Sequence, residues 1–138
     1  MNELYVMDAC ALLAFFNDEQ GADFVDDIFK KAHNTTAQII MHSLNLLEVY
    51  YDICRKYGED RAAHELTKMK QLPMTINTEI SGQLFKEAGR LKASYKISLA
   101  DSIALAQAFI LRAKLITSDH HEFDLIEKNE PINFLWIR

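Results

Sequence analysis

The sequence predicts a three-layer α/β/α fold, in which a mostly parallel sheet of four to five short strands lies between helices. Short apolar runs alternate with longer helical patterns along the chain, which is typical of parallel sheets covered on both faces. The segment 99–111 is apolar at ten of its thirteen positions and carries Asp101 as its only charge. Such a helix belongs in the protein interior.

The composition is that of one domain, expected to span residues 1–138 around a single core. The chain is 49% hydrophobic and 25% charged, with four Gly and two Pro. No apolar run approaches the roughly 20 residues of a membrane span, and the first residues lack the basic region of a signal peptide. Cys10 and Cys54 offer no disulfide framework, so a reducing cytoplasm is the simplest location.

The formal net charge of −5 argues against a general nucleic-acid binder with a basic surface. It leaves a metal-dependent nuclease open, because the clustered acids of such a site count as negative until a cation neutralises them. The sequence contains neither a P-loop nor a glycine-rich dinucleotide motif.

The first half of the chain predicts three strands and four helices. Ser43 is expected to cap the third helix, Gly58 to end it, and Pro73 to end the fourth. The expected elements are a strand at 4–7, a helix at 9–16, a helix from 21, a strand at 38–41, helices at 44–57 and 60–72, and a strand at 74–76. The helix from Gly21 is expected to bury Phe24, Val25, Ile28 and Phe29.

The second half predicts three helices and two strands. A helix at 79–95 is expected to bury a face that includes Ile80 and Tyr95. The buried helix at 99–111 leads into a strand at 114–117, a short helix at about 122–128, and a last strand at 132–136. Sites in parallel sheets form beyond the carboxyl ends of the strands. Asp8 and Asp119 both stand there.

Each acidic residue of interest also has a simpler interpretation. Asp8 suits the N-cap of the helix at Ala9, and Asp119 suits the N-cap of the helix after it, without excluding metal binding. Asp101 follows Ser98 at the spacing of a capping box and gains from the helix dipole. Glu48 shares a helical stripe with Asn45, Asp52 and Arg55, so its periodicity favours a solvated surface position.

Other chemistries have weaker support. His120 and His121 lack further ligands at zinc-site spacing, so surface histidines are expected. Cys10 as a nucleophile has no identified base. A phosphatase with Asp8 as nucleophile would need a second acid where Cys10 stands. A non-catalytic interaction module stays open, because Phe15, Phe16, Tyr50 and Tyr51 could serve a partner as readily as the core.

Four segments, VMDACALLAFF, SLNLLEVYYDI, ISLADSIALAQA and LITSDHHEFD, resemble in order and spacing the acidic motifs of the PIN-domain family. The resemblance covers nearly the whole chain, and the most similar subgroup is the VapC-like ribonuclease toxins of prokaryotic toxin–antitoxin systems. It implies a PIN-like fold with an acidic pocket that binds Mg²⁺ or Mn²⁺. The family's catalytic and metal-binding acids fall on Asp8, Glu48, Asp101 and Asp119.

The resemblance also implies supporting roles. Cys10 stands where the family often has a small hydroxyl residue, and Thr117 or Ser118 is expected to supply a hydroxyl close to Asp119. Glu122 is expected as an additional acid in the same pocket.

The function implied by the resemblance is hydrolysis of RNA phosphodiesters with a divalent cation, by a homodimer that a small antitoxin protein inhibits. Four retained acids favour this function over the interaction module, because a pure binder gains nothing from clustered negative charge. Basic residues before the buried helix are candidates for steering RNA, and equally for a solvated helix face. They are Lys86, Arg90, Lys92 and Lys96.

Overall fold

A five-stranded sheet with the strand order β3-β2-β1-β4-β5 forms the centre of the computed structural model, which describes residues 2–138. Every pairing between neighbouring strands is parallel. The predicted α/β fold is therefore confirmed. The strands are β1 (Glu3–Met7), β2 (Ala37–His42), β3 (Thr75–Asn77), β4 (Lys114–Thr117) and β5 (Asn133–Trp136).

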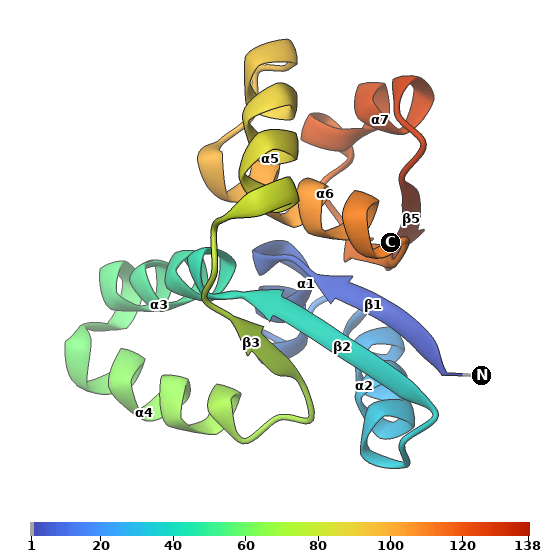
Figure 1. Ribbon diagram of the computed structural model, residues 1–138. Helices are drawn as coiled ribbons and strands as arrows, with labels where there is room; N and C mark the ends of the chain where they lie inside the picture. Colours follow the sequence, from blue (N-terminus) through green and yellow to red (C-terminus); the bar gives the residue numbers. More distant parts are fainter. Residues whose placement is uncertain (1) are drawn as a thin grey trace.

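Helices cover both faces of the sheet and complete three layers. The first four pack with one hydrophobic cluster and the last three with another, and Figure 1 shows α5, α6 and α7 together on one side of the sheet. The helices are α1 (Ala9–Phe16), α2 (Ala22–His33), α3 (Ser43–Tyr57), α4 (Glu59–Lys70), α5 (Gly82–Ser94), α6 (Leu99–Leu111) and α7 (His120–Asn129).

Burial on both faces explains why consecutive residues of the central strands are apolar. In β1, Tyr5 and Met7 belong to the cluster beneath α1–α4, whereas Val6 belongs to the cluster beneath α5–α7. In β4, Ile116 and Leu115 divide in the same way. Successive side chains of a strand point to opposite faces, so both must be apolar.

Among the helices of the described chain, α6 is the most deeply buried, as its apolar composition predicts. Residues 102–108 are all buried. The helix packs closely against α5 and also contacts α3 and β1. Helix α6 as a whole therefore lies against these three elements.

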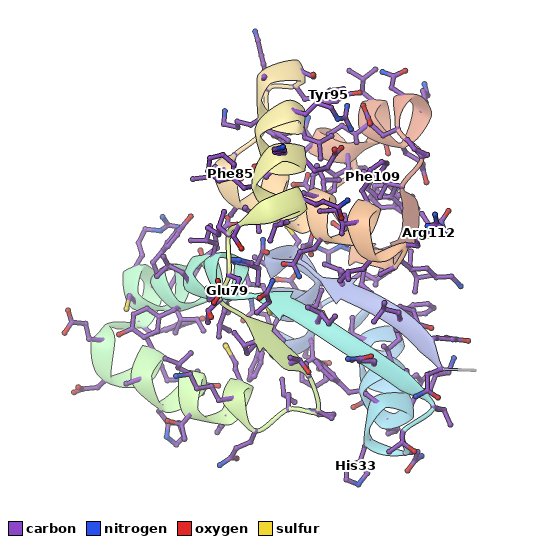
Figure 2. All side chains as sticks on the ribbon, in the orientation of Figure 1. His33, Glu79, Phe85, Tyr95, Phe109 and Arg112 are labelled. Atoms are coloured by element: carbon purple, nitrogen blue, oxygen red, sulfur yellow. The ribbon has the colours of Figure 1, made fainter. Side chains whose placement is uncertain are left out.

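The link before α5 differs from the prediction, because residues 79–81 are not helical. The Glu79 carbonyl lies 2.9 Å from His42 Nε2, and the Glu79 N–H donates to Asn77 Oδ1 at 3.1 Å. These bonds hold the segment in an extended link, and Figure 2 labels Glu79 between β3 and α5. Ile80 is consequently exposed, contrary to the prediction. His42 also caps α3 in place of Ser43, because its Nδ1 accepts the Leu44 N–H at 3.1 Å.

The buried face of α2 is narrower than predicted. Ala22, Val25, Ile28 and Phe29 are buried, whereas Phe24 is 42% exposed. A single helical position rotates a side chain by about 100°, which carries Phe24 away from the stripe that Val25 and Phe29 share. The boundaries of α4 and α7 differ from the prediction by one or two residues, which is ordinary for helix ends. Across residues 2–138 no helix combines the length and the apolar character that crossing a membrane requires.

Candidate active site

Two of the candidate acids follow neighbouring strands at the same edge of the sheet. Strands β1 and β4 pair with Met7 opposite Ile116, and the Asp8 N–H donates to the Ile116 carbonyl at 3.4 Å. Asp119 lies two residues beyond the end of β4. The parallel pairing therefore brings together two carboxylates that are more than 100 residues apart in the chain.

Both aspartates also cap helices, as their positions predict. Asp8 Oδ1 accepts the Ala11 N–H at 2.8 Å at the start of α1. Asp119 Oδ1 accepts the Glu122 N–H at 3.1 Å at the start of α7. One oxygen of each carboxylate is thus held by a backbone donor, which fixes the orientation of the side chain. Capping and a role in the pocket are compatible here.

The other two acids meet where α3 crosses the start of α6. Ser98 Oγ accepts the Asp101 N–H at 3.0 Å, so Ser98 is the N-cap of α6. The buried Asn45 side chain donates from Nδ2 to the Ala100 carbonyl at 3.1 Å. Glu48 lies one turn after Asn45 on α3, and this bond brings it towards Asp101.

One open pocket of about 540 Å³ collects the acids. Asp8 is 2% exposed and does not line the pocket, but it is close enough for its charge to interact with Asp101 and Asp119. All four candidate acids, together with Glu122, therefore share one electrostatic environment. The pocket is lined by Glu48, Lys92, Lys96, Ile97, Ser98, Asp101, Asp119 and Glu122.

Burial raises the pKa of Asp8 from 3.8 to about 7, and the charges of Asp101 and Asp119 add to the rise. Hydrogen bonds from the Thr117 hydroxyl and the Ala11 N–H oppose it by stabilising the ionised form. The Asp8 carboxyl therefore keeps its proton to a higher pH than a solvent-exposed aspartate does.

The pKa values of Glu48 and Asp101 are also raised above those of free side chains. Burial raises the pKa of Glu48 to about 7, with the charges of Asp101 and Asp119 as further causes. Burial likewise raises the pKa of Asp101 to about 6, and Asp119 adds to it. Helices α1, α6 and α7 all begin at this pocket, and their dipoles offset only part of the repulsion.

The donor set fits a hard divalent cation, because every candidate ligand is a carboxylate oxygen. Glu48 Oε1 is buried and has no hydrogen-bond partner among the described residues, so it is free to bind a cation. Within residues 2–138, no three acidic, histidine or cysteine side chains already converge on one point at ligand distance. Side-chain rotation towards a common centre would be part of binding, because the like charges otherwise repel.

The sequence analysis expected a hydroxyl close to Asp119 from either Thr117 or Ser118. In the structure it is the Thr117 hydroxyl that contacts Asp119. The Thr117 side chain is fully buried, and its Oγ1 accepts the Asp119 N–H at 3.1 Å. The same hydroxyl donates a hydrogen bond to the Asp8 carboxylate. Ser118 is half-buried and contributes its backbone carbonyl to the His120 N–H. Thr117 therefore connects the two aspartates.

Cys10 lies among the acids without the properties of a nucleophile. Burial raises the pKa of its thiol, and the charges of Asp8, Asp119, Asp101 and Glu48 raise it further. A thiol in this environment stays protonated at neutral pH, so the thiolate that nucleophilic attack requires does not form. Cys10 and Cys54 are both free.

Asn45 lies beside the candidate acids, a position that the sequence analysis did not predict. Its side chain is 0% exposed. Glu48 is half-buried, which differs from the solvated position that its periodicity favoured. The available signal was the spacing of three residues between Asn45 and Glu48, which puts both on the side of α3 that faces α6.

The four basic residues that were candidates for steering RNA lie in different surroundings in the structure. Lys92 and Lys96 line the acidic pocket, whereas Lys86 lines a different one. Arg90 is engaged by Glu87 and by Glu130, at 2.7 Å from the latter. His120 and His121 are exposed, as predicted, and neither lines the acidic pocket.

The model of the PIN-domain family matches residues 5–129 of the chain. No curated protein sequence matches at a significant level. Among solved structures, the fold is similar to a chain of a toxin-antitoxin complex from Klebsiella pneumoniae, with a TM-score of 0.64 and 22% identity over 97% of this chain and 98% of that one.

Two further structures show the same fold. A chain of VapBC2 from Rickettsia felis, solved bound to a DNA fragment from the promoter, has a TM-score of 0.70 and 16% identity over 96% of this chain and 97% of that one. A chain of VapBC-1 from nontypeable Haemophilus influenzae has a TM-score of 0.70 and 13% identity over 97% and 98%. At these identities the likeness establishes a shared fold.

Proposed function

The chain belongs to the PIN-domain family, and from that premise we propose that it is a divalent-metal-dependent endoribonuclease and the toxin of a toxin–antitoxin pair. The observation that supports the proposal is that Glu48, Asp101 and Asp119 line one pocket and interact electrostatically with the buried Asp8, and that three of the four carboxyls have a raised pKa. We place residues 1–138 in one nuclease domain that acts in the cytoplasm.

The proposed site divides its work among the four acids. Asp8, Asp101 and Asp119 would hold Mg²⁺ or Mn²⁺, with Glu48 completing the ligand set. When bound, the cation supplies the positive charge that activates water and neutralises the scissile phosphate. Asp8 and Asp119 are held for this role by their backbone donors and by Thr117.

The reaction is hydrolysis of an RNA phosphodiester. The oxygen of a water molecule bonds to phosphorus, the bond from phosphorus to the leaving ribose oxygen breaks, and that oxygen takes up a proton. Glu48, whose buried Oε1 has no hydrogen-bond partner among the described residues, would orient the attacking water and take up its proton. Glu122, on the rim of the same pocket, is a supporting acid.

A metal titration of RNA cleavage tests the function. We expect cleavage of unstructured RNA with Mg²⁺ or Mn²⁺, none in excess chelator, and a loss of roughly 10²–10⁴-fold in Asp101→Asn and Asp119→Asn. Asp52→Asn is the matched control, because Asp52 pairs with Arg55 and Lys56 outside the pocket. Cleavage that persists in chelator would contradict the mechanism.

The proposal includes a homodimer and a small antitoxin partner. Its support is the likeness of the fold to chains of VapBC complexes. A basic side chain from the partner would pair with the pocket carboxylates and exclude RNA and metal. Light scattering that shows a monomer at high concentration would contradict the dimer, and a neighbouring gene product that fails to co-purify would contradict the partner.

The alternative, a non-catalytic interaction module, has less support. Of the aromatic residues that could serve it, Phe15, Phe16 and Tyr50 pack against the core, and Tyr51 is 46% exposed. A binding module would also retain buried carboxylates at a cost in stability, without a return in affinity. Absence of cleavage on varied RNAs with both cations would favour this alternative.

A further inference from the structure

A second pocket of about 550 Å³ adjoins the acidic pocket. The two share Lys96, Ile97 and Glu122 in their linings and so form one groove. The groove starts at the carboxylates, crosses the link between α5 and α6, and ends against α7. Figure 2 shows Tyr95 where α5 ends beside α7. The site therefore has room for more of a substrate than the scissile phosphate.

Lys96 provides positive charge where the two pockets meet. Among residues 2–138, neither Lys92 nor Lys96 takes part in an ion pair, although both line a pocket of carboxylates. Arg90, in contrast, is bound to Glu87 and Glu130. The two lysines are therefore available to hold phosphate oxygens in a pocket that would otherwise repel them.

The far wall of the groove presents an aromatic ring and two exposed side chains. The Tyr95 hydroxyl donates to Glu130 Oε2 at 2.6 Å and its ring packs against the core, which holds the ring in place. The His121 side chain is 93% exposed and Leu125 is 61% exposed. Rigid rings and apolar side chains beside a basic residue are the elements that receive unstacked bases in single-stranded nucleic acids.

We propose that this groove is a binding subsite for one unpaired ribonucleotide next to the scissile phosphate. Lys96 contacts the neighbouring phosphate, and the wall of Tyr95, His121 and Leu125 receives the base. The inference rests on the proposed function and adds to it the residues that would receive an unpaired base, because a duplex keeps its bases stacked away from such a wall.

The phosphate contact is tested by binding without cleavage. Asp101→Asn serves as the parent protein, in excess chelator, with a fluorescent unstructured oligoribonucleotide as the probe. Lys96→Ala should lower the slope of log K against log salt concentration by about 0.7, the value of one phosphate contact on a single strand. Lys86→Ala is the matched control, because Lys86 lies on the same helix and lines a separate pocket.

The base contact is tested with His121→Ala/Leu125→Ala and with oligoribonucleotides that carry one abasic position. The double variant should bind the intact oligomer roughly tenfold more weakly, as expected for loss of one stacked base. It should also lose most of the parent's preference for the intact oligomer over the abasic one. Phe85→Ala is the control, because Phe85 is 65% exposed on α5 and lines neither pocket.

The outcomes separate this inference from the function beneath it. If the unsubstituted protein cleaves RNA with Mn²⁺ while Lys96→Ala and the double variant bind as the parent does, the subsite is overturned and the nuclease stands. Equal weakening by Lys86→Ala, or equal affinity for a fully paired hairpin, also overturns the subsite. If the unsubstituted protein neither binds nor cleaves RNA, both proposals fail.

Discussion

Asp8 follows a buried strand directly and is itself buried, so its ionisation affects the stability of the fold. Its pKa is about 7 in the folded protein and 3.8 as an unperturbed side chain. Between these values the folded state binds more protons than the unfolded state, and the free energy of unfolding therefore decreases as pH rises. The stabilisation is fully present below about pH 4 and is lost as the pH passes through 7.

Asp8→Asn should flatten this pH dependence. One such group contributes a slope of at most about 1.4 kcal/mol per pH unit between its two pKa values, and the amide has no proton to lose. Urea unfolding in chelator from pH 5 to pH 8 measures the slope, with Asp23→Asn, exposed in α2, as the control. Parallel curves for the wild type and Asp8→Asn would refute the assignment.

Asn45 is the residue that joins α3 to the start of α6. Replacing it with Ala removes the donor to the Ala100 carbonyl, but also a buried oxygen, Oδ1, that has no partner among the described residues. The substitution should therefore cost about 0.5–1.5 kcal/mol of unfolding free energy. It should also weaken Mn²⁺ binding, because Glu48 and Asp101 are no longer held together. Chemical denaturation and metal-induced melting shifts measure the two effects.

Gln107→Met is the matched control for Asn45→Ala. Gln107 is equally buried, in the middle of α6, and neither its side-chain nitrogen nor its oxygen has a partner among the described residues. A flexible apolar side chain of similar length should therefore be neutral or stabilising there. If both substitutions weaken Mn²⁺ binding alike, Asn45 acts through general packing and not by positioning.

The residues of the candidate site differed in how far the sequence could place them. Asp8 and Asp119 follow apolar strands, and parallel pairing at a common edge makes their proximity predictable. Glu48 and Asn45 lie on a helix with two buried sides, one against the core and one against α6. Helical periodicity detects the first side alone, so only the family resemblance pointed to Glu48, and Asn45 could be found only through its spacing of three residues from Glu48.

At the scale of elements, the first turn of α6 allows capping and metal binding to be tested separately. Ser98 caps the helix, and Asp101 is the proposed metal ligand. Ser98→Ala removes the cap and should cost about 1 kcal/mol, while the thermal shift with Mn²⁺ is retained. Asp101→Asn should melt no lower than the wild type without metal and should lose most of its Mn²⁺ response. Equal Mn²⁺ responses in the wild type and Asp101→Asn would remove Asp101 from the site.

Elements defined by continuous apolar runs were predictable, and those defined by a single bond were not. The bounds of α1 and α6 agree with the prediction because apolar character alone marks them. The predicted start of α5 was wrong because His42, 37 residues away, holds Glu79 outside the helix. Contacts of that separation leave no trace in local sequence patterns.

At the scale of the whole molecule, a cation should stabilise the fold of this acidic protein. Binding to the folded state alone adds about 2.7 kcal/mol at 100 times the Kd, which corresponds to roughly 9 °C in Tm for a chain of this length. The shift should be larger at pH 8 than at pH 5.5, because protons compete for Asp8, Glu48 and Asp101.

Thermal melts with and without Mn²⁺ at fixed ionic strength measure that shift at the two pH values. Asp52→Asn should keep the full response, because Asp52 is already paired with Arg55 and Lys56. A shift of the same size at both pH values would mean that the cation binds away from the carboxylates with raised pKa.

The pairing of β1 with β4 also sets when the site can exist during synthesis of the chain. Strand β1 lies between β2 and β4 in the sheet. One of its two edges therefore has no strand to pair with until residues 114–117 have been translated. A nascent chain that stops short of β4 lacks Asp119 and the partner that holds Asp8 in place. The proposed site therefore cannot form until nearly the whole polypeptide has been made.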